Sequence, residues 1–530
     1  MRGLLVHGIL IAIREEQGLK VCSLFFSVYS QFRTLLHAES QPGLTAILEK
    51  SPKEMTPQER CLFIDGQTPE GGLYTDAQRP IHPDANSSWQ VGSDPWRLPE
   101  SVLSHLEEMG QHLHAFYKAA NLLYNHSWRG IQPEWVAGYL DQGKPESVVA
   151  LGRMNRIKQH LPMVIRPDII PTREGMIATE LDSVPGGIGF TASLGARYSA
   201  LDEPIVGGPD GMVDGFERML RSFAGCDDPA VGIVISEESV SWRPEMVWIA
   251  DRLNARGLET HVTTPEEIVF TEDGLYAPAE GDLRRIDVVY RFFELFDLKN
   301  IPKMELILYA AKKNLVKVTP PLKSYLEEKM MMALFQHPML RDFWQQQLSS
   351  ETLSFLEQLF PRTWILDPAP LPPHATIHGL EVKGRPFADW RHLGHLGQKD
   401  RQLVIKPSGF SELAWGSRGV AIGHDVSEHD WQETINTALD RFETNPHILQ
   451  IFHNGATFPV EHYDFESGEM RKFRGRVRLQ PYYFVVDDAP VLSGVQATIC
   501  PPDKKLLHGM VDAVVLPCGL LPQPQSVGNP

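Results

Sequence analysis

Between Arg166 and Asp182 the chain reads R-P-D-I-I-P-T-R-E-G-M-I-A-T-E-L-D, which predicts two strands joined by a Glu-Gly turn. Asp168 lies before the turn, and Glu180 and Asp182 follow it. Because side chains alternate between the two faces of a strand, Glu180 and Asp182 are expected on one face and Leu181 on the other. Carboxylates on one face supply the hard oxygen ligands that Mg²⁺ prefers beside substrate phosphates. A solvated hairpin with scattered acidic residues is the alternative interpretation.

Length and composition limit the classes of function. The chain has 530 residues, enough for roughly two to four domains. Its net charge of −17 opposes a polyanion, so nucleic acid is not an expected partner. Five scattered cysteines suggest neither a disulfide framework nor a zinc site, and a reducing cytoplasm fits them best. The apolar stretch at residues 4–13 is too short to span a bilayer, so no membrane is expected either.

Apolar periodicity predicts helices and strands around this hairpin. Residues 103–123 carry an apolar stripe at helical spacing, and the helix is expected to begin near Pro99. His105, His112 and His114 lie off this stripe, which favours solvent-facing positions over metal binding. Further along, strands at 231–236, 259–262 and 286–290, with a helix at 244–256, predict an α/β unit with parallel strands.

A second chemical element reads L-V-I-K-P-S-G-F-S-E-L-A-W-G-S-R-G-V-A-I at residues 403–422. A strand is expected to end near Lys406, and a loop of small residues leads back into an apolar strand. Backbone N–H groups of such a loop can approach phosphate oxygens, and the lysine adds a positive charge. Lys406 precedes the glycines, so this is not a Walker A loop. A plain turn is the alternative. The small residues are Gly409, Ser411, Gly416, Ser417 and Gly419.

Two further segments have a functional and a structural interpretation. The apolar strand expected at residues 448–453 could offer backbone groups to an adenine edge, or could be a core strand. Arg476 and Arg478 are expected to share one face of a strand. Two arginines on one face can bind phosphate or carboxylate, but they would also fit a solvated strand edge.

In chain order these elements resemble the ATP-grasp ligases, and more narrowly the circularly permuted type represented by glutathionylspermidine synthase. Arg166-Pro-Asp168 and Glu180-Leu-Asp182 resemble the family's R-x-D and E-x-N segments, with Asp182 in place of the usual asparagine. The resemblance covers residues 155–500. It implies that Asp168, Glu180 and Asp182 hold Mg²⁺, and that Arg166 and Arg478 act on the acylphosphate or the substrate carboxylate.

The same resemblance implies an ATP site. The segment T-P-P-L-K-S-Y-L-E-E-K ending at Lys329, with H-P-M-L after it, resembles the region of the first ATP lysine. Lys406 resembles the second lysine, and residues 450–452 resemble the hinge beside adenine. The implied nucleotide-binding residues are Lys329, Lys406, Gly409, Ser411, Gly416, Ser417, Gly419, Gln450, Ile451 and Phe452.

The implied fold is an α/β circularly permuted ATP-grasp fold with a Rossmann-like pre-ATP-grasp domain. The implied activity is an ADP-forming carboxylate–amine ligase that uses ATP and Mg²⁺ on small-molecule substrates through an acylphosphate. Residues 287–294 and the C-terminal segment depart from the family pattern, so glutathione and spermidine are not carried over. A nucleotide-binding protein without turnover and a phosphotransferase on the same fold are the alternatives.

The chain is expected to divide into five parts. They are an N-terminal extension of unknown function at 1–95, a helical and metal-binding part at 96–200, a pre-ATP-grasp domain at 201–318, an ATP-binding part at 319–515 and a flexible tail at 516–530.

Overall fold

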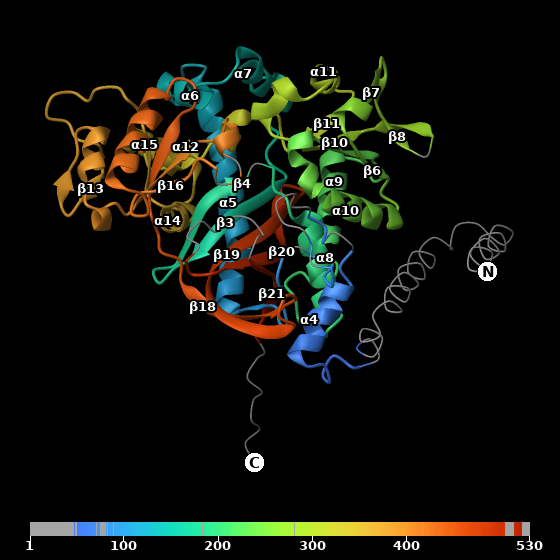
Figure 1. The fold of residues 1–530 in the computed structure, drawn as a ribbon. Helices are drawn as coiled ribbons and strands as arrows, with labels where there is room; N and C mark the ends of the chain where they lie inside the picture. Colours follow the sequence, from blue (N-terminus) through green and yellow to red (C-terminus); the bar gives the residue numbers. More distant parts are fainter. Residues whose placement is uncertain are drawn as a thin grey trace.

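Figure 1 shows the fold of the chain in a computed structural model. The structure describes residues 47, 50–69, 72–74, 81, 83–87, 89–182, 184–279, 281–414, 416, 418–503 and 513–521. Much of the expected N-terminal extension, the end of the expected tail and the predicted site residue Ser417 therefore lie outside the described residues.

A large, mainly antiparallel sheet forms the centre of the molecule (Figure 1). Within the described residues it has eight strands, and the hairpin of β3 and β4 joins it by pairing with the long strand β19. Apolar residues alternate along β19 and β20, and their buried side chains belong to the main core. The strands are β1 (Val91–Gly92), β2 (Trp96–Leu98), β3 (Val164–Pro171), β4 (Met176–Asp182), β18 (Thr457–Asp464), β19 (Glu469–Val486), β20 (Ala489–Cys500) and β21 (Val514–Leu520).

Strand β21 corrects the expected tail. Residues 516–520 belong to this strand, which pairs antiparallel with β20 and parallel with β2. Leu516 and Cys518 are buried. The run V-V-L-P-C-G-L therefore completes the core instead of fraying, because its apolar side chains gain more from burial than the chain end loses in freedom.

Helix α5 (Glu100–Ser127) packs against the sheet and against α14 (Ser350–Leu359), and it begins where the sequence predicts. The expectation of solvent-facing histidines is wrong for two of the three. His112 is buried, and its Nδ1 lies 3.0 Å from Thr352 Oγ1, while His114 Nε2 lies 3.0 Å from Asp488 Oδ1. A single apolar stripe did not reveal these positions because α5 is covered on more than one face.

The predicted parallel sheet is confirmed. Its order is β11-β10-β5-β6, all neighbours are parallel, and every residue of β5 and β10 is buried, as their apolar runs require. Ile286 ends the preceding strand β9 rather than starting β10. The elements of this region are α8 (Ile188–Ser199), α9 (Gly211–Ala224), β5 (Val231–Ile235), α10 (Arg243–Ala255), β6 (Thr260–Thr263), β7 (Val269–Thr271), β8 (Gly274–Ala279), β9 (Asp282–Ile286), β10 (Val288–Phe292), α11 (Met304–Lys313) and β11 (Lys317–Thr319).

A smaller antiparallel sheet of order β12-β17-β15-β16 lies on the other side of the central sheet (Figure 1). Helix α15 covers it with the buried residues Trp431 and Ile435. Lys406 lies on β15, and the predicted hinge residues lie on and after β17. The bounds are α12 (Met330–Phe335), α13 (Arg341–Gln347), β12 (Thr363–Ile365), β13 (Glu381–Val382), β14 (Arg385–Pro386), β15 (Leu403–Pro407), β16 (Ala421–Ile422), α15 (Glu428–Asp440) and β17 (His447–Ile451).

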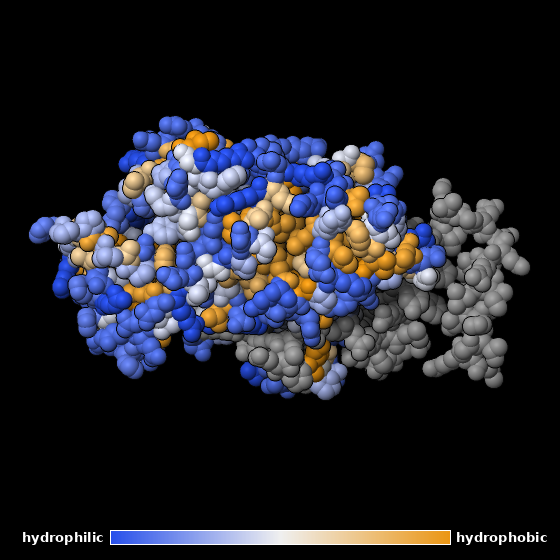
Figure 2. Space-filling model, turned by 90° about the horizontal axis from the view of Figure 1, so that it is seen from above, coloured by the Kyte–Doolittle hydropathy of each residue, from blue (hydrophilic) through white to orange (hydrophobic). Residues whose placement is uncertain are grey.

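The remaining helices are α4 (Pro57–Gly66), α6 (Glu134–Asp141) and α7 (Glu146–Gly152). The face seen from above is mostly hydrophilic, with apolar side chains gathered toward its middle (Figure 2). Among the helices that the structure describes, none has the length and apolar character needed to cross a membrane.

Candidate functional site

A cavity of about 120 Å³ opens where the β3–β4 hairpin, the small sheet and β19 meet. These elements are far apart in the sequence, and the fold brings their predicted site residues to one place. The predicted residues that line the cavity are Asp168, Glu180, Lys329, Lys406, Gln450, Ile451, Phe452 and Arg478.

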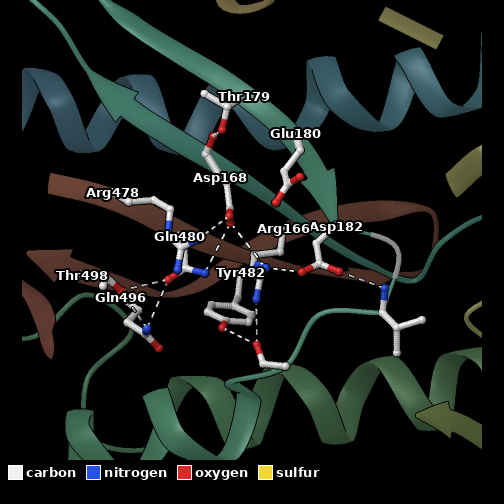
Figure 3. Close-up of polar contacts among 12 residues, drawn as sticks. Arg166, Asp168, Thr179, Glu180, Asp182, Arg478, Gln480, Tyr482, Gln496 and Thr498 are labelled. Atoms are coloured by element: carbon white, nitrogen blue, oxygen red, sulfur yellow. Dashed lines mark hydrogen bonds and ion pairs between the residues drawn. The ribbon is translucent and has the colours of Figure 1, made fainter. Parts of the chain in front are cut away.

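The hairpin presents its acidic residues in a defined register. Asp168 lies opposite Glu180, and Arg166 lies opposite Asp182, with a bulge just after Asp168. A bulge re-aims neighbouring side chains and is common beside functional sites. Figure 3 shows Asp168, Glu180 and Asp182 projecting from the hairpin toward β19. The alternation expected along β4 is thus present, since Leu181 packs in the core on the other side.

Asp168 is the most constrained of these acids. It is buried, and its Oδ2 accepts a hydrogen bond of 2.9 Å from Arg478 Nη1. Its Oδ1 accepts from Gln480 Nε2 at 3.3 Å and lies 3.4 Å from Arg166 Nη2 (Figure 3). Charge-assisted contacts of this kind hold a carboxylate in one orientation.

Asp182 does not line the cavity. It forms an ion pair with Arg166, and its Oδ1 accepts a hydrogen bond of 3.0 Å from Val184 N. Arg166 of β3 is buried and therefore needs a counter-charge. Asp182, which lies opposite it in the register of the hairpin, provides that charge. In the part of the chain that the structure describes, no group of three or more His, Cys, Asp or Glu side chains is placed to hold a metal. The three carboxylates are therefore not arranged as one ready-made metal-binding group.

Two carboxylates still face the cavity, and they fit Mg²⁺ that is delivered with a nucleotide. Mg²⁺ is commonly held by one or two carboxylates, while phosphate oxygens and water complete its octahedron. Asp168 and Glu180 are the pair that would supply those oxygens, since both line the cavity. The donor chemistry therefore suits the ion without the third acid.

Glu180 lies within a group of positive charges. Its Oε2 is 3.3 Å from Lys329 Nζ. Burial acts to raise the pKa of Glu180, but Lys329, Lys406, Arg478 and Arg166 outweigh it and lower that pKa to about 2. Glu180 is therefore ionised at neutral pH and available as an anionic ligand.

Lys406 is buried, and its Nζ donates a hydrogen bond of 2.9 Å to Thr179 O. Burial lowers the pKa of Lys406 to about 8, with Lys329 acting in the same direction and Glu180 and Asp168 opposing. The lysine remains mostly protonated at neutral pH. Lys406, Lys329 and Arg478 are the lysine and arginine residues of the cavity lining, and Asp168 and Glu180 are its acidic residues. The basic side chains therefore outnumber the acidic ones by one.

Among the described residues, the predicted members of the small-residue loop after Lys406 do not line the cavity. Leu413, Ala414 and Val420 form that part of the wall instead. The glycines serve packing: a Cβ at Gly409 would lie 2.6 Å from Glu327 O, and one at Gly419 would lie 2.7 Å from Pro407 Cγ. The predicted loop residues outside the lining are Gly409, Ser411, Gly416 and Gly419.

The two lysine-bearing segments are joined directly. Lys329 N donates to Ser408 O at 2.8 Å, and Met330 N donates to Ser408 Oγ at 3.1 Å. The neighbouring Glu328 is buried in an ion pair with Lys144, 2.7 Å long, and its Oε1 also accepts from Phe410 N at 3.3 Å. Sequence reasoning missed Lys144, because nothing in a surface-like D-Q-G-K-P segment signals a buried partner.

The hinge provides apolar surface more than free backbone donors. Ile451 N donates to Arg362 O, and Phe452 N donates to Gln402 O, each at 3.0 Å. These two N–H groups are therefore already paired within the protein. That the strand offers backbone groups to an adenine edge stays a prediction. Apolar lining residues that the sequence analysis did not single out as site residues complete this end of the cavity: Ile170, Ile177, Val404 and Ile422. None of the four has a polar side chain next to it in the sequence, so no local pattern marked them as site residues.

Comparisons with known proteins add a distant likeness. No family model matches the chain, and no curated protein matches it. It is similar to the solved structure of a glutathione synthetase-like effector from Globodera pallida, with a TM-score of 0.48, 10% identity, and coverage of 82% of this chain and 90% of that one. It is also similar to a provisionally assigned gamma-glutamylcysteine synthetase from Methylobacillus flagellatus, with a TM-score of 0.34, 11% identity, and coverage of 77% and 88%. Likenesses at this level carry no conclusion about activity, so function is argued from the site.

Proposed function

We propose that the cavity binds ATP with Mg²⁺ and that the protein is an ADP-forming carboxylate–amine ligase with a circularly permuted ATP-grasp arrangement. The observation that carries the proposal is the convergence of Lys329, Lys406 and Arg478 with Asp168 and Glu180 on one cavity. Cations of this kind suit a polyphosphate, and carboxylates beside them suit the metal that accompanies it.

The nucleotide's orientation follows from the two ends of the cavity. The apolar end beside Ile451 and Ile422 suits a base, and the charged end beside Lys329 and Arg478 suits phosphates. This orientation places the terminal phosphate near Asp168, Glu180 and Arg478. The side chains next to the γ-phosphate would therefore come from the β3–β4 hairpin and from β19.

The chemistry that this arrangement supports is attack on the γ-phosphorus. A substrate carboxylate oxygen forms a bond to that phosphorus, the bond to the β-phosphate oxygen breaks, and an acylphosphate and ADP result. An amine then attacks the acyl carbon, phosphate leaves, and the amine loses its proton as an amide forms. Lys329, Lys406 and Arg478 offset the charge on the transferred group in a partly buried cavity, where each pairing is stronger than in water. Bound Mg²⁺ would add further neutralisation of phosphate charge.

A screen of small carboxylic acids, each with and without a panel of amines, tests the activity by ADP release in the presence of ATP and Mg²⁺. The expected result is ADP release that requires both an acid and an amine for continued turnover. Release that gives a stable phosphorylated product regardless of amine would support a phosphotransferase instead. ATP binding with no turnover on any pair would leave the nucleotide-binding alternative.

The protonation of Lys406 makes nucleotide affinity pH-dependent. In the ligand-free protein the pKa of Lys406 is about 8. A bound phosphate raises the pKa of the lysine beside it, so Lys406 keeps its proton to higher pH when the nucleotide is bound. The bound state then holds more protons, so affinity for an ATP analogue should fall as pH rises above that value, by up to about 10-fold per pH unit. Titration calorimetry between about pH 7 and pH 9.5 checks this. Lys406→Met should lose the dependence, and a flat or rising wild-type profile would contradict the assignment.

A further inference from the structure

The arginine two residues before Arg478 differs from its neighbours on the same strand face. Arg474 Nη2 donates to Thr457 O at 2.6 Å, and Arg478 Nη1 donates to Asp168 Oδ2 at 2.9 Å. Arg476 lies between them, and its Nε and Nη1 are buried with no hydrogen-bond partner among the described residues. Buried donors in native structures are nearly always paired, and leaving a charged one unpaired is costly. A bound ligand that accepts hydrogen bonds would pair these two donor atoms of Arg476.

Arg476 also lies at a break in the sheet. Along one edge of β19, β18 pairs with residues 469–476, and β3 pairs farther along, from Leu479 to Phe484. Arg476 is thus the last residue paired with β18 before β3 takes over. Ala456 N donates to Pro171 O at 2.8 Å and bridges the two neighbours at this point.

This break adjoins the cavity. A Cβ built at Gly455 would lie 3.8 Å from Arg476 Cδ and 3.1 Å from Ile170 Cγ2. Ile170 lines the cavity, and so does His453, two residues before Gly455. Gly455 therefore lies between the Arg476 side chain and Ile170 of the cavity wall.

We propose that Arg476 binds a second carboxylate of the acid substrate, so that the acid is a dicarboxylate. This inference rests on the proposed function, because it takes the reacting carboxylate to lie beside Arg478. Two residues along a strand span about 7 Å, which matches the separation of the two ends of a short dicarboxylic acid. Arg478 is already shared with Asp168, so the unmatched charge at Arg476 is a single positive one. A carboxylate balances it, whereas a phosphate would bring excess negative charge.

Binding of glutarate and of butyrate tests the subsite, measured by titration calorimetry on the full chain with Mg²⁺ and a non-hydrolysable ATP analogue present. The wild-type protein should bind glutarate at least about 10-fold more tightly than butyrate, as expected for one added charged hydrogen-bonded contact. Arg476→Gln should abolish this preference and leave affinity for the ATP analogue within about 2-fold. Arg474→Gln, on the same face with its own backbone partner, should change none of these values.

The thermal midpoint of the ligand-free protein separates this role from a structural one. Arg476→Gln should leave that midpoint unchanged or raise it, since it removes two buried donor atoms that have no partner among the described residues. A clear fall in the midpoint would show that Arg476 supports the fold and would overturn the proposal. So would equal affinity of wild-type protein for glutarate and butyrate, or an unchanged preference in Arg476→Gln. Failure of the wild-type protein to bind the ATP analogue would contradict the proposed function itself and the subsite with it.

Discussion

Glu180→Gln is expected to reduce magnesium-dependent turnover on the order of 100-fold while leaving the protein folded. Glutamine keeps the shape of the side chain, so packing is preserved, but the ligand charge is lost. Glu180 is ionised at neutral pH, since four cations lower its pKa to about 2 against the opposing effect of burial. Turnover is measured as ADP release across a range of Mg²⁺ concentrations, with the thermal midpoint as the check on folding.

Glu174→Gln is the matched control for this change. Glu174 lies in the exposed turn of the same hairpin and does not line the cavity. It should retain turnover close to that of the wild-type protein. Equal loss in both variants, or no loss in either, would mean that the hairpin is a solvated surface feature and not part of a metal site.

Lys406→Met is expected to weaken binding of an ATP analogue by roughly 1.5–3 kcal/mol, the usual value of a hydrogen bond to a charged group. Methionine fills nearly the same space without the charge, and the site is buried enough that water does not replace the lost contact. Lys329→Met should behave similarly, because Lys329 Nζ lies in the same cluster, 3.3 Å from Glu180. Titration calorimetry in the presence of Mg²⁺ measures both.

Lys399→Met controls for loss of a positive charge on the same part of the protein. Lys399 is exposed and does not line the cavity. Its replacement should leave analogue affinity unchanged. If both Lys406→Met and Lys329→Met also bind the analogue as the wild-type protein does, the two lysines do not contact phosphates.

Local patterns predicted much of the fold. Continuous apolar runs predicted parallel strands at 231–236 and 286–290, close to the observed β5 and β10, since strands buried on both faces are mainly apolar. Alternation placed Glu180 and Asp182 on one face of β4. The convergence of Lys329, Lys406 and the hairpin on one cavity could be anticipated only from the order of motifs along the chain, because no local pattern brings such distant segments together.

The misses have physical causes that depend on tertiary contacts. Asp182 pairs with Arg166 because the register of β3 and β4 places them opposite each other. The turn and the bulge after Asp168 set this register. Close packing requires glycine at positions 409 and 419 of the loop, with or without a ligand. The sequence alone does not show whether a glycine is needed for packing or for binding phosphate. His112 is buried because a second layer covers α5.

In the proposed reaction, transfer of the γ-phosphoryl group activates a carboxylate. Incubation with ATP, Mg²⁺, the acid and hydroxylamine, with the amine withheld, tests it most directly. Because the cationic groups and the facing carboxylates surround the charged end of the cavity, we expect ADP as the nucleotide product and a hydroxamate of the acid. Formation of AMP and pyrophosphate as the only nucleotide products would contradict this account, since it would place the reaction at the α-phosphorus.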